Sequence, residues 1–478
     1  MKDAPFGASC LGLTSTKHDV RRESVMEDVR QIWSWWQSLL IGFRRVFTGP
    51  GWVRFVQWVT GTVLCWEEHT ITQILVSLAM ESRWRVLECF AEYGAWDRER
   101  VEQQTVRLIE QEHPAKLGKY HPVALDDTKE HRTSQDVWGT CTFHESSARS
   151  PNRAETVRAH NWVVAGDLIA GKPWSYLPHT ARLYFRKSQL PVGETFQTKT
   201  ALAVQMLRQI AAESPSPVLA VTDGAYAVDT VVQPCLNPPP GQARIDVVSR
   251  PRTDARLYHP PLANRVRPDG KKRSGPDRKW GRRMPSPKRH AEWDTPWKNG
   301  KAYIYGRLRK VRYKQVLCQW AVSGWKHLVH AFVFEVEGYE EPWYLISTAL
   351  DLSAEQAVEI FAARFRQENG FRDHKQRLGM EECRAWTKEP VLRTFQVQMI
   401  ALTLLRLLQF RLDAAWGAGE WWLKPEWNLG KQHPSILDLR RLFWRHRERI
   451  AQLLLKLEEL DHSETSATKR QRAAQKAA

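Results

Sequence analysis

The segment from Phe361 to Lys375, FAARFRQENGFRDHK, carries residues whose types and spacing could do chemistry. Arg364, Glu368 and Lys375 follow one another at gaps of four and seven residues, so on an α-helix they share one face. Phe361 falls close to the same face. A carboxylate between two cations suits a helix that presents an acid to a metal ion while its cations bind phosphates. The segment therefore predicts metal-dependent chemistry on phosphate groups.

Two acidic segments upstream offer partners for that acid: LDDT at 125–128 and AVTDG at 220–224. Phosphodiester cleavage uses two divalent cations about 4 Å apart, and such ions take oxygen ligands from several converging carboxylates. Asp126 ends one predicted strand and Asp223 ends another, so both can meet Glu368 on a helix packed across the sheet edge. Each acid taken alone is typical of a turn. Asp127, on the opposite strand face, is the alternative to Asp126.

Composition bounds the class of protein. The chain has 478 residues, 42% of them hydrophobic, and a net charge of +18, which predicts a globular protein with a polyanionic partner. Its seven cysteines contain no C-x-x-C pair, which argues against a disulfide framework or a zinc ribbon and suits a reducing compartment. No stretch reaches the roughly 18 apolar residues of a membrane span. These features predict a soluble cytoplasmic protein.

The pattern of elements predicts an α/β (α+β) fold: a mixed sheet flanked by helices, interrupted by a β-rich insertion and preceded by a helical N-terminal domain. In that domain, residues 70–90 fit either a helix-turn-helix or a plain helical bundle. Residues 217–223 form a continuous apolar strand, and 392–408 a buried helix behind the sheet. The expected units are a helical domain that binds DNA ends (1–115), a first core part (116–232), a basic insertion (233–343), a second core part (344–412) and a helical region with a basic tail (413–478).

The most basic segment is 265–289, where eleven Lys and Arg residues accompany two Asp residues among Gly and Pro. This composition predicts a flexible loop, and contact with a DNA backbone is favoured over a merely solvated loop. The candidate DNA-binding residues in it are Lys271, Lys272, Arg273, Arg282 and Arg283. Histidines 121, 131, 144 and 160 lack the spacing of metal ligands and are expected to lie on the surface or to make hydrogen bonds.

The chain resembles bacterial insertion-sequence DDE transposases with an RNase H-like core, in the branch that has a β-rich insertion before its last acid. That branch carries the helix pattern Tyr-x2-Arg-x3-Glu-x6-Lys, the YREK motif, which Phe361, Arg364, Glu368 and Lys375 match at every interval and in three of four residues. Asp126-Asp127-Thr128 matches its D-x-T motif and Asp223-Gly224-Ala225-Tyr226 its D-G-x-Y motif. The D-x-T register favours Asp126 as the first ligand. Phe361 lacks the tyrosine hydroxyl, a change worth about 1 kcal/mol that should weaken activity without abolishing it.

The resemblance implies cut-and-paste transposition. Asp126, Asp223 and Glu368 would hold two Mg²⁺ ions, which Mn²⁺ could replace, and would cut double-stranded DNA at the terminal inverted repeats through hairpin ends. The ends would then join target DNA within a homodimer. Arg364 and Lys375 would contact end phosphates, and Trp343 would either stack on a flipped base or serve as an ordinary strand-edge aromatic.

Two alternatives stay open beside an active transposase. One is an inactive or domesticated descendant that binds DNA without cutting it; the presence of all three acids speaks against this, and the Phe361 change keeps it open. The other is an RNase H-like nuclease without strand transfer, against which the large basic insertion speaks.

Overall fold

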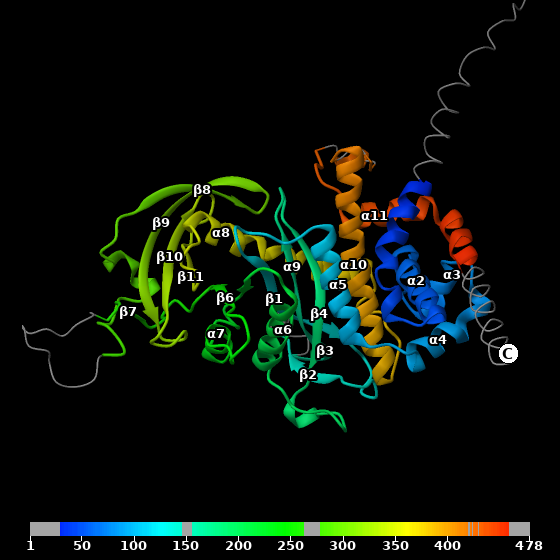
Figure 1. Ribbon diagram of the computed structural model, residues 1–478, viewed down its shortest axis with the longest axis horizontal. Helices are drawn as coiled ribbons and strands as arrows, with labels where there is room; N and C mark the ends of the chain where they lie inside the picture. The colour runs from blue at the N-terminus through cyan, green and yellow to red at the C-terminus, as the bar shows by residue number, and fades with distance from the viewer. Residues whose placement is uncertain are drawn as a thin grey trace, which may run out of the picture.

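The computed structural model describes residues 29–145, 155–261, 278–418, 421–422, 424–428 and 430–457. Within these ranges, eleven strands form one mixed sheet. Helices pack against it, and the long helix α10 runs between the sheet and the N-terminal helices (Figure 1). The predicted fold class, a mixed sheet flanked by helices, is confirmed.

The central part of the sheet has the topology of an RNase H-like core. Strands β4, β3 and β1 pair antiparallel, and β1, β5 and β6 pair parallel. All five residues of β5 are buried, as its continuous apolar sequence predicts. The elements of this part are β1 (His121–His131), β2 (Cys141–His144), β3 (Thr156–Ile169), β4 (Ser175–Tyr184), α6 (Lys199–Glu213), β5 (Val218–Thr222), α7 (Asp229–Leu236) and β6 (Asp246–Ser249).

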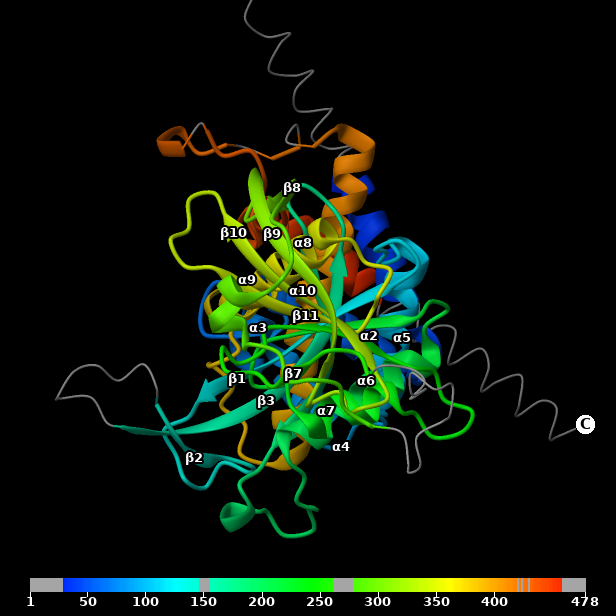
Figure 2. The ribbon, with the colours of Figure 1, turned by 90° about the vertical axis from the view of Figure 1, so that its left-hand side faces the viewer.

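The same sheet continues beyond β6 through antiparallel strands. β6 lies within residues 233–343, the predicted insertion, yet it pairs with β5 in the core and with β11 beyond it. In Figure 2 the outer strands stand in front of the core, and β2 with the adjoining end of β3 extends away from the body. The outer strands are β7 (Leu257–Tyr258), β8 (Lys298–Ile304), β9 (Arg307–Trp320), β10 (Leu328–Val336) and β11 (Trp343–Ser347).

Two consecutive helices, α8 (Ala354–Ala363) and α9 (Phe365–Arg377), follow the last strand. A capping box starts α8, where Ser353 and Gln356 bond each other's backbone N–H groups. Arg364 joins the two helices with a right-handed helical backbone. The segment predicted as one helix is therefore helical on both sides of Arg364.

Helix α10 (Lys388–Trp416) is buried along most of its length because it belongs to a hydrophobic core shared with the N-terminal helices and with α11. Its polar side chains find partners there: Arg393 donates to the backbone oxygens of Phe90 and Ala91, at the end of α4. The predicted units 1–115 and 413–478 thus contribute to one core. The other helices here are α2 (Gly49–Leu64), α3 (Ile71–Val76), α4 (Trp84–Tyr93), α5 (Arg98–Glu112) and α11 (Ile436–Arg445), and short 3-10 helices span 44–46, 81–83, 187–189, 287–292 and 426–428.

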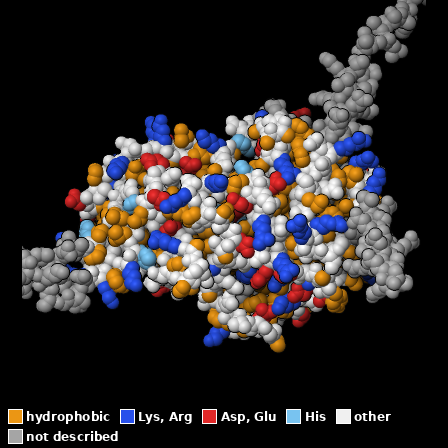
Figure 3. Space-filling model, in the orientation of Figure 1, with side chains coloured by type: hydrophobic (Ala, Val, Ile, Leu, Met, Phe, Trp, Pro, Cys, Tyr) orange, Lys and Arg blue, Asp and Glu red, His pale blue; other side chains and the backbone are white. Residues whose placement is uncertain are grey.

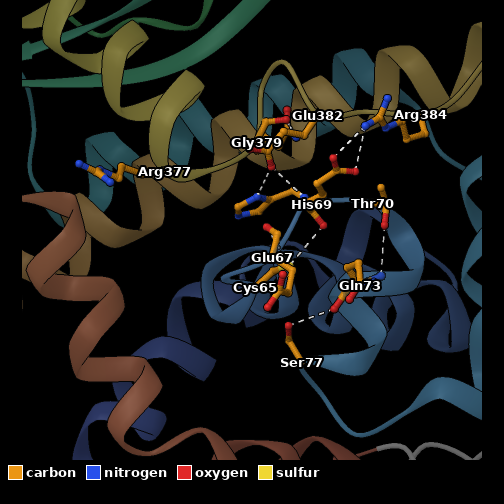
Figure 4. A network of polar contacts seen from close by, with 12 residues as sticks. Cys65, Glu67, His69, Thr70, Gln73, Ser77, Arg377, Gly379, Glu382 and Arg384 are labelled. Carbon is orange, nitrogen blue, oxygen red and sulfur yellow. Dashed lines mark hydrogen bonds and ion pairs between the residues drawn. The ribbon is translucent and has the colours of Figure 1, made fainter.

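Polar contacts fasten the N-terminal helices to the segment between α9 and α10 (Figure 4). Glu382 accepts hydrogen bonds from the His69 backbone N–H at 2.8 Å and from its Nδ1 at 2.7 Å. Arg384 lies 2.9 Å from Glu68. These contacts connect the N-terminal helices to residues 378–387, which follow the helix that carries Glu368.

Among the described residues, α10 is the one helix long and apolar enough to cross a membrane, and 94% of its most apolar window is buried inside the protein. A core helix passes the same test of length and composition. Its position between the sheet and the N-terminal helices is that of a core helix (Figure 1).

Candidate active site

Two of the predicted acids lie side by side on neighbouring strands. Leu125 of β1 pairs in parallel with Thr222 of β5. Asp126 and Asp223 each follow one of these paired residues, so they lie next to each other. Adjacent strands lie about 4.8 Å apart. Burial raises the pKa of Asp126 to about 6; the Asp223 charge adds to the rise, and Arg364 opposes it. The fold therefore concentrates negative charge at this edge of the sheet.

Asp127 points to the other face of β1 and has different partners. Its Oδ2 lies 2.6 Å from Lys199 Nζ on α6, and its Oδ1 accepts a hydrogen bond of 3.1 Å from the Tyr226 hydroxyl. Successive side chains of a strand alternate between faces. Asp126, and not Asp127, therefore shares a face with Glu368.

Arg364 joins the third acid to the first. Its Nη1 donates to Asp126 Oδ2 at 2.8 Å, and its Nη2 donates to Glu368 Oε1 at 3.0 Å. The Arg364 side chain is 13% exposed and that of Glu368 45% exposed. One guanidinium thus places its positive charge between two carboxylates that come from opposite ends of the core.

The remaining motif residues lie on either side of this bridge. Phe361 is half-buried, with its ring 5.9 Å below the Arg364 guanidinium. Lys375 pairs with Glu381 at 3.1 Å, and the same Glu381 oxygen lies 3.3 Å from His131. The structure thus brings Phe361 and Arg364 to the acids, whereas Lys375 sits further along α9 with a carboxylate partner of its own.

Trp343 belongs to an aromatic cluster beside Arg364. Tyr305 lies at its centre, with ring centroids 5.8 Å from Trp343, 6.1 Å from Tyr339 and 5.2 Å from Phe365. Tyr305 and Phe365 are 42% and 41% exposed. Tyr305 and Gly306 form the two-residue turn between β8 and β9 with φ of +48° and +85°, values that favour Asn or Gly over Tyr.

Sequence reasoning missed Tyr305. The available signal was a tyrosine followed by glycine between two strand-like runs, which predicts the turn but not the neighbours of the ring. A tyrosine side chain at a strained backbone position is a candidate for a functional role.

The described end of the basic segment is packed against strands, in contrast to the predicted flexible loop. Arg283 forms a β-bridge with Tyr258 and lies 5.4 Å over its ring. The Arg282 backbone oxygen accepts a hydrogen bond from His259. The prediction was wrong for residues 278–289 because these aromatic and backbone contacts order them. Lys271, Lys272 and Arg273 lie outside the described residues.

Over the face in Figure 3, Lys and Arg side chains are interspersed with acidic and hydrophobic ones. On this face, the charged side chains of the described residues are therefore mixed in sign and are not gathered into one basic patch.

The three acids match the oxygen-donor chemistry that Mg²⁺ and Mn²⁺ prefer. In the described ranges, however, no group of three or more His, Cys, Asp or Glu side chains is arranged to hold a metal ion. The Arg364 guanidinium lies between two of the three acids, 2.8 Å from Asp126 and 3.0 Å from Glu368. Asp126, with a pKa raised by burial and by Asp223, suits a site that receives a cation.

Comparison with known proteins gives a family. Residues 52–317, more than half of the chain, match the family model described as DDE superfamily endonuclease. The matched range includes Asp126 and Asp223 and ends before Glu368. No curated protein matches the chain. With its RNase H-like sheet and this match, the chain belongs to the DDE superfamily endonucleases.

Proposed function

We propose that this endonuclease is the transposase of an insertion sequence, which cuts the element's ends and joins them to target DNA. The observation that carries the proposal is the pair Asp126 and Asp223 on adjacent parallel strands, with Glu368 linked to Asp126 through Arg364. Three carboxylates from distant parts of the chain would thus serve one phosphodiester.

Asp126, Asp223 and Glu368 would hold two Mg²⁺ ions, which when bound activate the attacking oxygen and stabilise the leaving oxygen. The chain's own residues position the DNA. Arg364 and Lys375 would bind end phosphates through charge-assisted hydrogen bonds, for which each must exchange its present carboxylate partner. The cations at 271–273, 282 and 283 would contact the DNA backbone, and the N-terminal helices the element's ends.

The full reaction in this proposal is cut-and-paste transposition through hairpin ends. The partners are two terminal inverted repeats and a target duplex, brought together by a homodimer near the nucleoid. The match to Tyr-x2-Arg-x3-Glu-x6-Lys and the strands β7–β11 between the second and third acids support this branch of the family.

The function is tested with a DNA end that already carries a free 3′-OH and with a supercoiled target plasmid. A transposase joins the end to the plasmid in the presence of Mg²⁺ or Mn²⁺. A nuclease without strand transfer cuts intact ends but yields no joined product. An inactive descendant binds the ends and does neither, so either of the last two results contradicts the proposal.

The aromatic cluster predicts that Tyr305, together with Trp343, stacks on an unpaired base near the cut. Tyr305→Asn removes the ring but suits the positive φ of the turn. Because stacking is worth about 1–3 kcal/mol per base, we expect it to weaken binding of an end with one unpaired base by about 5- to 150-fold. The measurement is fluorescence anisotropy at equal salt. Fully paired DNA is the control, and equal weakening for both DNAs would contradict stacking.

Arg364→Gln is expected to bind Mn²⁺ more tightly than the unmodified protein, by at least about tenfold for each carboxylate that the guanidinium no longer holds. The guanidinium competes for two carboxylates, and each charged hydrogen bond is worth about 1.5–3 kcal/mol. Electron paramagnetic resonance of free Mn²⁺ measures the affinity without DNA. Arg445→Gln, at an exposed arginine at the end of α11, is the matched control. Weaker Mn²⁺ binding in Arg364→Gln would mean that Arg364 orients the acids and does not compete for them.

A further inference from the structure

The helix that carries Glu368 also lines a cavity of about 570 Å³, which none of the three acids lines. Arg366, Asn369 and Arg372 of α9 form one wall. The opposite sides come from residues 170–176, which form the β3–β4 connection and the start of β4, and from α10 and residues 432–435. Because a helix turns once in about 3.6 residues, Arg366 points to a different flank of α9 from Glu368.

Cations outnumber acids in the cavity lining. Four side chains, those of Lys172, Arg366, Arg372 and Arg406, face Asp373 and Asp413. Asp373 pairs with Arg406 at 3.3 Å, and Asp413 accepts a hydrogen bond from Trp421 Nε1 at 2.6 Å. Within the described part of the chain, Lys172, Arg366 and Arg372 have no carboxylate partner.

The positive charges in the cavity oppose one another. Arg366 lines the cavity as a partly buried side chain, and no carboxylate of the described residues pairs with it. Burial and then the Arg366 charge lower the pKa of His433 across the cavity. Of the three cations without a carboxylate partner, Arg366 is partly buried, whereas Lys172 and Arg372 are exposed. A partly buried charge without a partner is costly, and an anion in the cavity would offset that cost at Arg366. Arginine, with its planar fork of donors, is suited to phosphate.

The cavity adjoins the parts of the site that would meet DNA. Tyr303 and Gly306 line it, and Tyr305 between them belongs to the aromatic cluster. Arg366 precedes Glu368 by two residues, and Asn369 follows it directly. A DNA strand that passes the three acids and the exposed aromatic rings would therefore place its neighbouring phosphates at the cavity.

We infer that this cavity binds a backbone phosphate of the DNA strand that passes the catalytic acids, through Arg366 and Arg372. The inference rests on the proposed function, since it concerns the substrate of the same site. The ligand chemistry is a phosphodiester, and inorganic phosphate shares it, so the experiment separates these two sources.

The test scans methylphosphonates, which are neutral, along the DNA end and measures binding to the original chain and to Arg366→Gln. A methylphosphonate at one position of the DNA should weaken binding to the unmodified protein by about tenfold. The same methylphosphonate should not weaken binding to Arg366→Gln, because the arginine that contacts this phosphate is already absent. In addition, Arg366→Gln should lower the slope of log affinity against log salt by about 0.9, and the double variant with Arg372→Gln by about twice that. Arg366→Lys should keep the slope, and Arg445→Gln is the matched control.

These experiments measure DNA binding and need no cleavage. Their outcome can therefore contradict the phosphate site without contradicting the strand-transfer proposal, and the reverse. Thermal unfolding of each variant confirms that it is folded. If no methylphosphonate position distinguishes Arg366→Gln from the original chain, the inference is wrong. If, in addition, inorganic phosphate raises the melting temperature of the original chain but not of Arg366→Gln, the cavity is a site for free anions and not for DNA.

Discussion

Glu368→Gln is expected to lower the rate of DNA cleavage by about 1,000-fold or more while leaving DNA binding intact. The amide keeps the size of the side chain and can still accept the hydrogen bond from Arg364 at 3.0 Å in the original chain. It loses the negative charge that would hold a divalent ion, whose stabilisation of developing charge is worth several kcal/mol. Each 1.36 kcal/mol is a factor of ten in rate. Single-turnover cleavage in Mg²⁺ measures the rate, and a gel-shift assay measures the binding.

The matched control for this prediction is Glu335→Gln on β10, an exposed glutamate that lies 3.4 Å from Arg312. A surface pair of this kind is worth at most about 1 kcal/mol, so cleavage should stay at the original rate. Undiminished cleavage by Glu368→Gln would remove Glu368 from the catalytic set. Loss of DNA binding along with cleavage would instead point to a role for Glu368 in substrate contact.

The adjacent positions of Asp126 and Asp223 could be predicted from the sequence because strand ends are local features. A continuous apolar run ending in Asp223 predicts a buried strand, and the parallel register then aligns Thr222 with Leu125, next to Asp126. The alternation of side chains along β1 could not by itself choose between Asp126 and Asp127. The two side chains differ in their long-range partners: Asp127 pairs with Lys199, and Asp126 pairs with Arg364.

The features that sequence reasoning missed depend on contacts between distant segments. β6 has only four residues and lies within a Pro- and Arg-rich stretch, so nothing local distinguishes it from a loop until β5 and β11 pair with it. The spacing of Arg364 predicted a phosphate ligand, yet the structure pairs it with two acids. The core that α10 shares with the N-terminal helices and α11 likewise joins segments far apart in the sequence. From composition alone, these segments were predicted to be separate units.

Asp167→Asn is expected to cost about 3–5 kcal/mol of folding free energy, the second large effect. Asp167 on β3 is 2% exposed and lies between two buried histidines, 2.7 Å from His121 Nε2 and 3.0 Å from His179 Nε2. Removing one partner of a buried ion pair leaves an uncompensated charge. Urea unfolding at pH 6 measures the loss.

The hydrogen bonds around His121 fit a positively charged ring. If the Ser214 hydroxyl donates to the Ser216 carbonyl at 2.8 Å, its oxygen accepts from His121 Nδ1, which lies 2.8 Å away. Its Nε2 faces the Asp167 carboxylate and donates as well. Burial alone would lower the pKa of His121, but Asp167 overcomes this and raises it above 6.5. Burial would raise the pKa of Asp167, but His121 and His179 lower it below 3.8.

These shifts fix how the cost of Asp167→Asn varies with pH. The His121 contribution is complete below pH 6.5 and is lost as pH rises through its raised folded pKa. The Asp167 contribution is complete above pH 3.8 and is lost as pH falls through its lowered folded pKa. The difference in unfolding free energy should therefore be largest between these values and shrink toward pH 8. Asp254→Asn, whose Arg252 pair is mostly exposed, should change stability by less than about 1 kcal/mol. A cost for Asp167→Asn that stays constant as pH rises above 6.5 would mean that His121 is neutral in the folded protein, because a histidine that is neutral in both states exchanges no proton on unfolding in this range.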